Sequence, residues 1–154
     1  MTGVQTCALP IYRNILVPTD GSDITGKAVQ TALSLAKTVG AQLSVISVKE
    51  PFPYSAISEM QPVPPQEFYD AQERIASARV KAVSEAAAAA GVACTAATVE
   101  AVHPWEAIVD YAKGQGCDLI VMASHGRRGV SALLLGSETQ KVLTHCQTPV
   151  LVIK

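Results

Sequence analysis

The sequence predicts an α/β fold in which a parallel β-sheet is covered by helices on both faces. Two observations predict it. Short apolar segments alternate along the chain with segments of helical periodicity, and the apolar segments are continuous runs. Continuous runs are typical of strands that are buried on both faces, and right-handed crossovers place the connecting helices on those two faces.

The first half of the chain begins with a strand over 15–17. Apolar residues recur at helical spacing over 22–39, and Gly40 ends this helix. A second strand is expected over 43–48. Five prolines lie between residues 51 and 65, so this stretch is predicted to be a long loop at the ligand edge of the sheet, where it could cover a bound base as a lid.

The second half of the chain continues the alternation. The alanine-rich segment 66–90 predicts a long helix that ends at Gly91. Pro104 suits the first turn of a helix that extends to about residue 113. The remaining patterns predict strands over 92–99, 118–122 and 150–153, and a helix over 137–145.

Composition limits the class of protein. The chain has 154 residues, of which 49% are hydrophobic and 16% charged, as expected for one compact soluble domain. No apolar run is long enough to span a membrane. The net charge of −1 and the lack of a basic cluster beyond Arg127 and Arg128 argue against nucleic acid as a partner. The four cysteines have no metal-ligand spacing, which indicates reduced thiols and a cytoplasmic location.

Residues 1–11 do not fit the α/β pattern. They resemble the translation of a sequencing adaptor, and the alternative is a short disordered tail. We therefore expect the domain to comprise residues 12–154.

The most informative stretch follows the apolar run 119–122. Ala123-Ser-His-Gly126 is followed by nine residues and then by Gly136-Ser137-Glu138-Thr139. Ser137 is placed to be the N-cap of a helix, with Gln140 at the capping-box position. Small residues let backbone N–H groups approach an anion, and a helix N-terminus adds partial positive charge. The pattern predicts a phosphate site, although Gly136 and Ser137 could equally serve only as turn and cap.

This spacing resembles the nucleotide-binding signature of the universal stress protein family, which is Gly, two residues, Gly, nine residues and Gly-Ser/Thr. The resemblance extends from about Arg13 to Lys154 and includes the family's first strand and turn at 13–22. Ala123 replaces the first glycine of the signature. In a left-handed or closely approached position alanine would be strained, whereas in ordinary β conformation it would cost almost nothing.

The resemblance implies a doubly wound, Rossmann-like sheet of five strands in the order 3-2-1-4-5. The winding then reverses between strands one and four, and ligands bind at such a reversal, outside the carboxyl ends of the strands. The segments 18–20 and 123–126 would converge there.

The resemblance also implies that ATP binds in this crevice, with Mg²⁺ or Mn²⁺. Asp20 would contact the ribose or the cation, and its structural alternative is an Asx turn. Val48 and Met122 would contact adenine, and their alternative is plain core. The backbone of the phosphate loop and the hydroxyls of Ser137 and Thr139 would hold the phosphates. The complete set of expected binding residues is Pro18, Thr19, Asp20, Val48, Met122, Ala123, His125, Gly126, Arg127, Gly136, Ser137, Glu138 and Thr139.

Three functions are compatible with these features. The first is a nucleotide-dependent regulatory module of the stress response. The second is a slow ATPase or adenylating enzyme, which the lack of a positioned general base disfavours, because His125 has no carboxylate beside it in the sequence. The third is a nucleotide-free protein whose site is lost at Ala123. The apolar strand 150–153 would form a sheet edge, and the family resemblance implies a homodimer through it.

Overall fold

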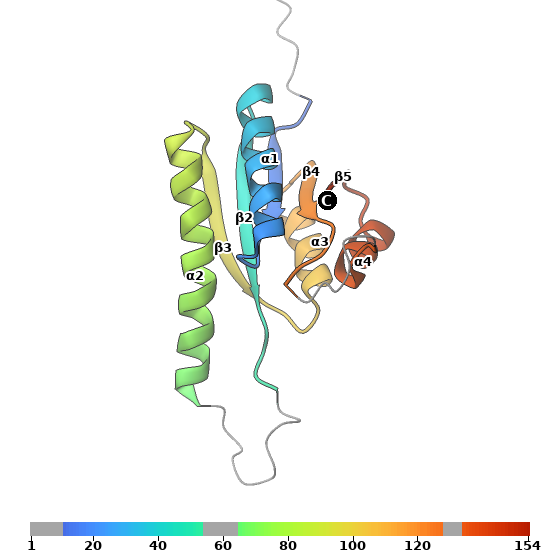
Figure 1. Ribbon diagram of the computed structural model, residues 1–154. Helices are drawn as coiled ribbons and strands as arrows, with labels where there is room; N and C mark the ends of the chain where they lie inside the picture. The colour runs from blue at the N-terminus through green and yellow to red at the C-terminus, as the bar shows by residue number, and fades with distance from the viewer. Residues whose placement is uncertain (1–10, 54–64, 128–133) are drawn as a thin grey trace, which may run out of the picture.

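The computed structural model describes residues 11–53, 65–127 and 134–154. Strands and helices alternate, and each of their bounds lies within two residues of its predicted position. Residues 1–10 of the predicted tail 1–11 and residues 54–64 of the predicted lid 51–65 lie outside the described ranges. The elements are β1 Asn14–Pro18, α1 Asp23–Val39, β2 Gln42–Lys49, α2 Gln66–Ala89, β3 Cys94–Glu100, α3 Pro104–Gly114, β4 Leu119–Ala123, α4 Ser137–His145 and β5 Val150–Ile153 (Figure 1).

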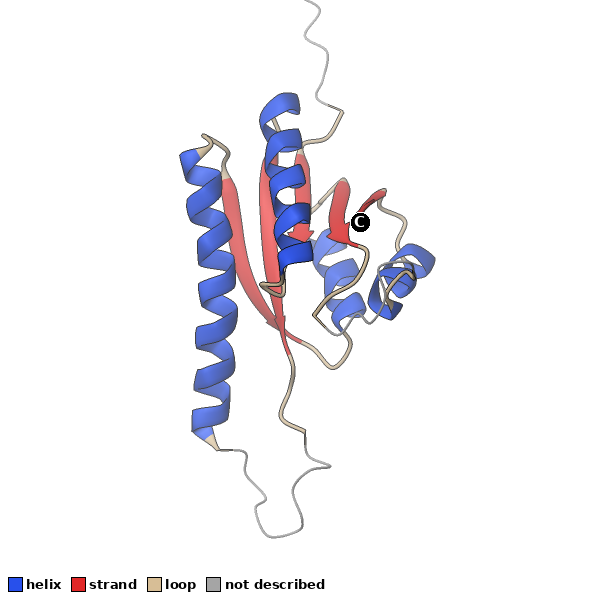
Figure 2. Cartoon of the chain, viewed as in Figure 1, coloured by secondary structure: helices blue, strands red, loops and turns tan. Residues whose placement is uncertain are grey.

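The five strands form one parallel sheet in the order β3-β2-β1-β4-β5, which confirms the predicted doubly wound fold. β1 is central and pairs with β2 on one side and with β4 on the other. Helices lie on both sides of the sheet (Figure 2). Within the described ranges, no helix combines the length and the apolar character needed to cross a membrane.

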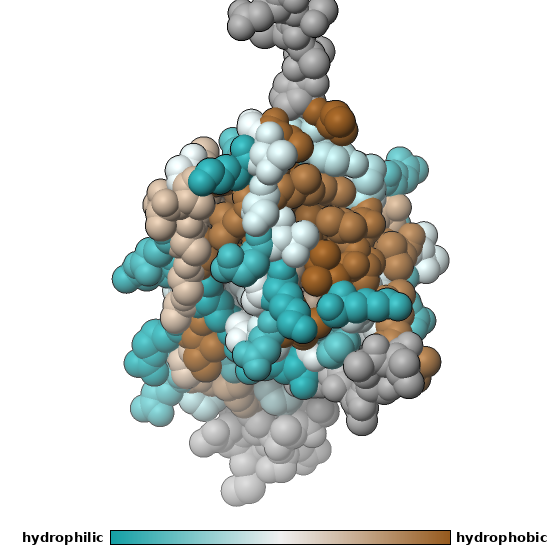
Figure 3. Space-filling view, turned by 45° about the horizontal axis from the view of Figure 1, so that its top comes forward, coloured by the Kyte–Doolittle hydropathy of each residue, from teal (hydrophilic) through white to brown (hydrophobic). Residues whose placement is uncertain are grey.

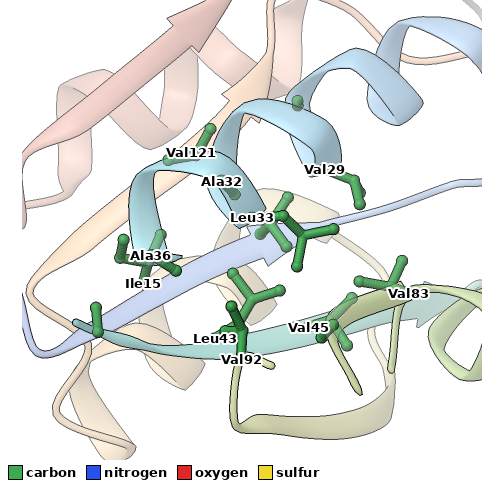
Figure 4. Packing of buried hydrophobic residues seen from close by; sticks show 14 of the residues in the cluster. Ile15, Val29, Ala32, Leu33, Ala36, Leu43, Val45, Val83, Val92 and Val121 are labelled. Carbon is green, nitrogen blue, oxygen red and sulfur yellow. The ribbon is translucent and has the colours of Figure 1, made fainter. Parts of the chain in front are cut away.

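The sheet separates two hydrophobic clusters. Ile15 and Val17 of β1 belong to the cluster formed with α1 and α2, and Figure 4 shows Ile15 beside Ala36 of α1. Leu16 packs with residues of α3 and α4 on the opposite face. All three side chains are fully buried. Because successive strand residues point to opposite faces, both faces of the central strand must be apolar, and this is why its sequence is a continuous apolar run.

A polar network fixes the amino-terminal edge of the central strands. The Asp118 carboxylate accepts hydrogen bonds from the backbone N–H groups of Arg13 (2.8 Å) and Asn14 (3.1 Å). The Ser44 hydroxyl donates to the Asn14 side-chain oxygen at 2.8 Å. These bonds join the start of β1 to β2 and to the residue before β4. They help to hold the register of the three strands, which also aligns their carboxyl ends.

The long helix α2 is attached to the sheet by a carboxylate as well as by its apolar face. The Glu73 carboxylate contacts the ammonium group of Lys49 at 2.6 Å and accepts hydrogen bonds from the hydroxyls of Ser77 (2.7 Å) and Thr98 (3.1 Å). Together these contacts lower the pKa of Glu73 to about 2. Lys49 ends β2 and Thr98 lies on β3, so one side chain connects α2 to both strands.

A buried and an exposed isoleucine allow a matched test of the core. Ile46 is fully buried in the centre of the sheet, whereas Ile75 on α2 is 48% exposed. Ile46→Ala should lower the free energy of unfolding by about 2–5 kcal/mol, because it leaves a cavity between well-packed layers. Ile75→Ala should change it by no more than about 0.5 kcal/mol. Urea denaturation followed by circular dichroism measures both, and equal losses would contradict the core assignment.

Candidate functional site

The ends of β1 and β4 are joined by the side chain of Asp20. One carboxylate oxygen, Oδ1, accepts from the backbone N–H of Ser22 at 2.9 Å and from the Thr25 hydroxyl at 3.0 Å. The other, Oδ2, accepts from the backbone N–H of Arg127 at 2.8 Å. The first bond is the Asx turn considered for Asp20, and the last holds the loop after β4 against the turn after β1. We call these contacts the Asp20 latch.

The electrostatic state of Asp20 follows from these contacts. Burial raises the pKa of its carboxyl, but the hydrogen bonds from Ser22, Arg127 and Thr25 outweigh it, and the pKa lies below the ordinary value. The latch also requires a glycine at position 126, because a Cβ there would lie 2.8 Å from Asp20 Oδ2. Asp20, Gly126 and Arg127, which are expected site residues, are thus brought together.

Thr19 and Pro18 support the turn beside Asp20. The backbone N–H of Thr19 donates to the Ile46 carbonyl at 2.9 Å, so the chain continues along β2 for one residue beyond Pro18. The buried Thr19 hydroxyl accepts from the Gly21 N–H at 3.2 Å. Gly21 has φ +77°, a left-handed conformation that side chains rarely adopt.

Arg79 is a cation at this edge that the sequence analysis did not identify. Its side chain lies against Gly21, with Nε 3.2 Å from the position that a Cβ would take there. Burial and repulsion from Arg127 lower the pKa of the Arg79 guanidinium, while Asp20 raises it. The missed signal was periodicity: Arg79 is three residues after buried Ala76 and four before buried Val83, on the face of α2 that packs against the sheet.

A groove of about 450 Å³ lies beside Arg79, between α1 and α2. It borders the turn after β1 through Thr19, Gly21 and Ser22. Further along, small side chains of α2 line it. It therefore lies next to the crevice between the ends of β1 and β4.

The start of α4 differs from its prediction. Ser137 is the first helical residue rather than the N-cap; the N-cap is Gly136, in extended conformation and without a side-chain cap. The Gln140 amide does not complete a capping box and instead donates to the Leu135 carbonyl at 2.7 Å. The first N–H groups of α4 therefore have no side-chain cap from the N-cap residue.

The contacts of Gly136 explain this difference. Its N–H donates to the Ser124 carbonyl at 2.7 Å. A Cβ at this position would lie 3.1 Å from that oxygen and 3.1 Å from His125 Cα. A side chain here would press on the loop after β4, so glycine favours this close approach, and the cap lies one residue earlier than side-chain preference predicts.

The side chains that follow Gly136 point to different partners. The buried Thr139 hydroxyl donates to the Ala123 carbonyl at 3.0 Å, so it fastens α4 to β4. The Glu138 carboxylate accepts from the backbone N–H of Trp105 at 2.9 Å, in the first turn of α3. Ser137 is exposed at the crevice edge.

Ala123 occupies ordinary β backbone. It is the last residue of β4, pairs with Ile153 and is buried in the cluster beneath α1. No described non-glycine residue has positive φ. Alanine therefore costs no backbone strain here, which answers the conformational question that the sequence left open.

The two apolar residues expected near adenine belong to the opposite cluster. Met122 is buried and Val48 partly buried in the layer formed with α3 and α4. The structure thus gives both residues a packing role. His125 is half-buried, and its Nδ1 lies 3.1 Å from the Ser124 hydroxyl. Arg128, the second arginine of the loop, lies outside the described residues.

The fold is that of a doubly wound α/β protein. Its winding reverses between β1 and β4, and the close contacts there involve Gly126 and Gly136. The family model of the universal stress protein family matches residues 11–154, and the chain belongs to that family. A universal stress protein of Thermus aquaticus is 35% identical over 144 residues, which are 94% of this chain and all of the relative.

Two solved structures are similar over almost the whole chain. The Methanocaldococcus jannaschii protein MJ0577 has a TM-score of 0.79 and 26% identity, over 93% of this chain and 96% of that one. A universal stress protein in complex with cAMP has a TM-score of 0.69 and 28% identity, over 93% and 97% of the two chains.

The Asp20 latch makes stability depend on pH. Since folding lowers the pKa of Asp20, its stabilising contribution is complete above the ordinary aspartate pKa of about 3.9 and is lost as the pH falls through the lowered folded-state value. Asp20→Asn should lower the free energy of unfolding by about 1–3 kcal/mol at neutral pH. The difference in free energy of unfolding between Asp20→Asn and the wild type should become smaller as the pH falls.

Urea denaturation across this pH range measures the gap, with Asp110→Asn, exposed on α3, as the matched control. A gap that stays constant down to the lowest pH would show that the carboxylate charge is not what stabilises the latch.

Proposed function

We propose that this chain binds ATP, together with Mg²⁺, in the crevice between the carboxyl ends of β1 and β4, and that it acts in the cytoplasm as a nucleotide-dependent regulator of the stress response. The observation that carries the proposal is the glycine-capped start of α4 beside the loop after β4. N–H groups without a side-chain cap at a helix N-terminus are suited to phosphate oxygens.

Each part of the crevice has a role in this proposal. The backbone N–H groups of Ser137, Glu138 and Thr139 begin α4 and would donate to the phosphates, with the exposed Ser137 hydroxyl beside them. Gly126 and Gly136 would keep the crevice open to the ligand. The Thr139 hydroxyl, which is bonded to Ala123, would hold the helix in place rather than bind phosphate.

Asp20 is suited to a magnesium ion that arrives with the nucleotide. Its Oδ2 accepts a hydrogen bond from the Arg127 N–H, which uses one of the two lone pairs of that carboxylate oxygen. No group of three or more metal-binding side chains gathers in the described part of the chain. The phosphates would therefore supply further oxygen ligands, as is usual for Mg²⁺, and Mn²⁺ would fit the same donors.

The charges near the crevice also suit a polyphosphate. Arg79 and Arg127 lie close enough for repulsion to affect the ionisation of Arg79, with Asp20 as the neighbouring anion. A bound triphosphate would relieve this repulsion. The similarity to a universal stress protein in complex with cAMP supports an adenine nucleotide as the ligand class.

Isothermal titration calorimetry tests the proposal on the full chain with ATP and magnesium. The wild type should bind ATP with micromolar affinity and return it unhydrolysed. Gly136→Ala should bind at least about tenfold more weakly, a loss of about 1.4 kcal/mol, because its Cβ would push the start of α4 away from the loop. Gly114→Ala, where a Cβ would meet nothing within 4 Å, is the matched control. Absence of heat from the wild type would overturn the proposal.

We further propose a homodimer through β5. Among the described strands, β5 pairs with β4 and lies at the edge of the sheet, and Leu151 on it is 39% exposed. Leu143 on α4 is a second exposed apolar side chain, at 43%. Hydrophobic residues gather on the face shown in Figure 3, toward the side on which β4 and β5 lie in Figure 1. An apolar edge strand favours pairing with a second copy.

Light scattering tests the dimer. Val152→Lys places a charge on β5 and should reduce the mass in solution from that of two chains to that of one. Thr95→Lys places the same charge at an exposed position of β3, the opposite edge strand, and should leave the mass unchanged. An unchanged mass in Val152→Lys would remove β5 from the interface.

A further inference from the structure

Ser124 is held in place from three directions. Its backbone N–H donates to the Ile153 carbonyl at 2.7 Å, and its carbonyl accepts from the Gly136 N–H at 2.7 Å. The side chain is 2% exposed, and its hydroxyl lies 3.1 Å from Nδ1 of His125. Ser124 thus connects β5, the start of α4 and an imidazole ring at the edge of the crevice.

The direction of this hydrogen bond decides the tautomer of His125. A neutral imidazole has one nitrogen that donates and one that accepts. Among the described residues, the Ser124 hydroxyl has His125 Nδ1 as its hydrogen-bond partner. If Nδ1 carried the proton, the buried hydroxyl proton would have no acceptor there. Donation from Ser124 to Nδ1 satisfies both groups and leaves the ring proton on Nε2.

We propose that Ser124 is a positioning residue that holds His125 in the Nε2–H tautomer, so that the ring offers an N–H donor to the phosphates of a nucleotide. This role rests on the proposed ATP site. The Cα and Cβ of His125 lie 3.1 and 3.3 Å from the position of a Cβ at Gly136, so the histidine lies beside the glycine-capped start of α4. Phosphate oxygens only accept hydrogen bonds, and a ring that presented a bare nitrogen would repel them.

A second histidine provides an internal comparison. Nδ1 of His145 lies 2.8 Å from the Lys141 carbonyl oxygen, one turn earlier in α4. Since a carbonyl can only accept, Nδ1 of His145 carries the proton. The two rings therefore have opposite tautomers in one chain, and a spectrum that reports tautomers contains its own reference.

Nitrogen-15 NMR of the imidazoles of the ligand-free full chain, well above the ordinary histidine pKa of about 6.5, tests the tautomers directly. The expected result is a protonated Nε2 in His125 and a protonated Nδ1 in His145, with His125→Gln assigning the signals. Ser124→Ala should convert His125 to a mixture of tautomers and leave His145 unchanged. Ser34→Ala, exposed on α1, should change neither. Nδ1 protonation of His125 in the wild type would overturn the proposal, whether or not Ser124→Ala folds.

ATP titrations separate this role from the proposed function. Ser124→Ala and His125→Gln should each weaken ATP binding, and the double variant should bind no more weakly than His125→Gln alone, because Ser124 acts through the ring. Ser124→Thr, which keeps the hydroxyl, should restore the tautomer. If Gly136→Ala loses ATP while Ser124→Ala binds it as the wild type does, the proposed site stands and the role of Ser124 is overturned. If the wild type does not bind ATP, donation to phosphate is overturned even with the expected tautomers.

Discussion

β1 lies between β2 and β4, and this central position is the constraint on which the ligand edge depends. Parallel pairing on both sides brings the turn after β1 and the loop after β4 to one edge, although they are about a hundred residues apart in the sequence. The bond between the Arg127 N–H and Asp20 then closes the gap between them. The apolar centres of β1 and β4 provide the packing, while polar groups at the strand ends help to fix the register.

The two signature glycines, Gly126 and Gly136, are set by contact rather than by turn geometry, unlike Gly21 with its positive φ. Gly126 makes room for the Asp20 carboxylate, and Gly136 makes room for the backbone at His125. The signature spacing therefore describes two close approaches between loop segments. Ala123 falls outside them, on regular β backbone with its side chain in the core, which is why a methyl group fits where the family pattern has glycine.

Apolar runs, helical periodicity, alanine content and the placement of glycine and proline were sufficient to predict each described strand and helix, because these signals are local in the sequence. The cap of α4 was predicted incorrectly, since the local preference for Ser137 gave way to a long-range contact of Gly136. Arg79 was missed because it reaches the site from a helix far along the chain. The hydroxyl of Thr139 was assigned to phosphate, but a tertiary bond to Ala123 occupies it. Sequence patterns locate the crevice, whereas side-chain partners within it depend on three-dimensional packing.

The bond from the Ser124 N–H to the Ile153 carbonyl has a consequence for synthesis. The loop after β4 is held partly by β5, so its geometry is complete only when β5 has been added to the sheet. Residues 150–153 are synthesised after every residue that lines the crevice, so both halves of the crevice exist in the growing chain before the strand that supports them. The geometry of the crevice therefore depends on a strand that follows all of its lining residues in the sequence.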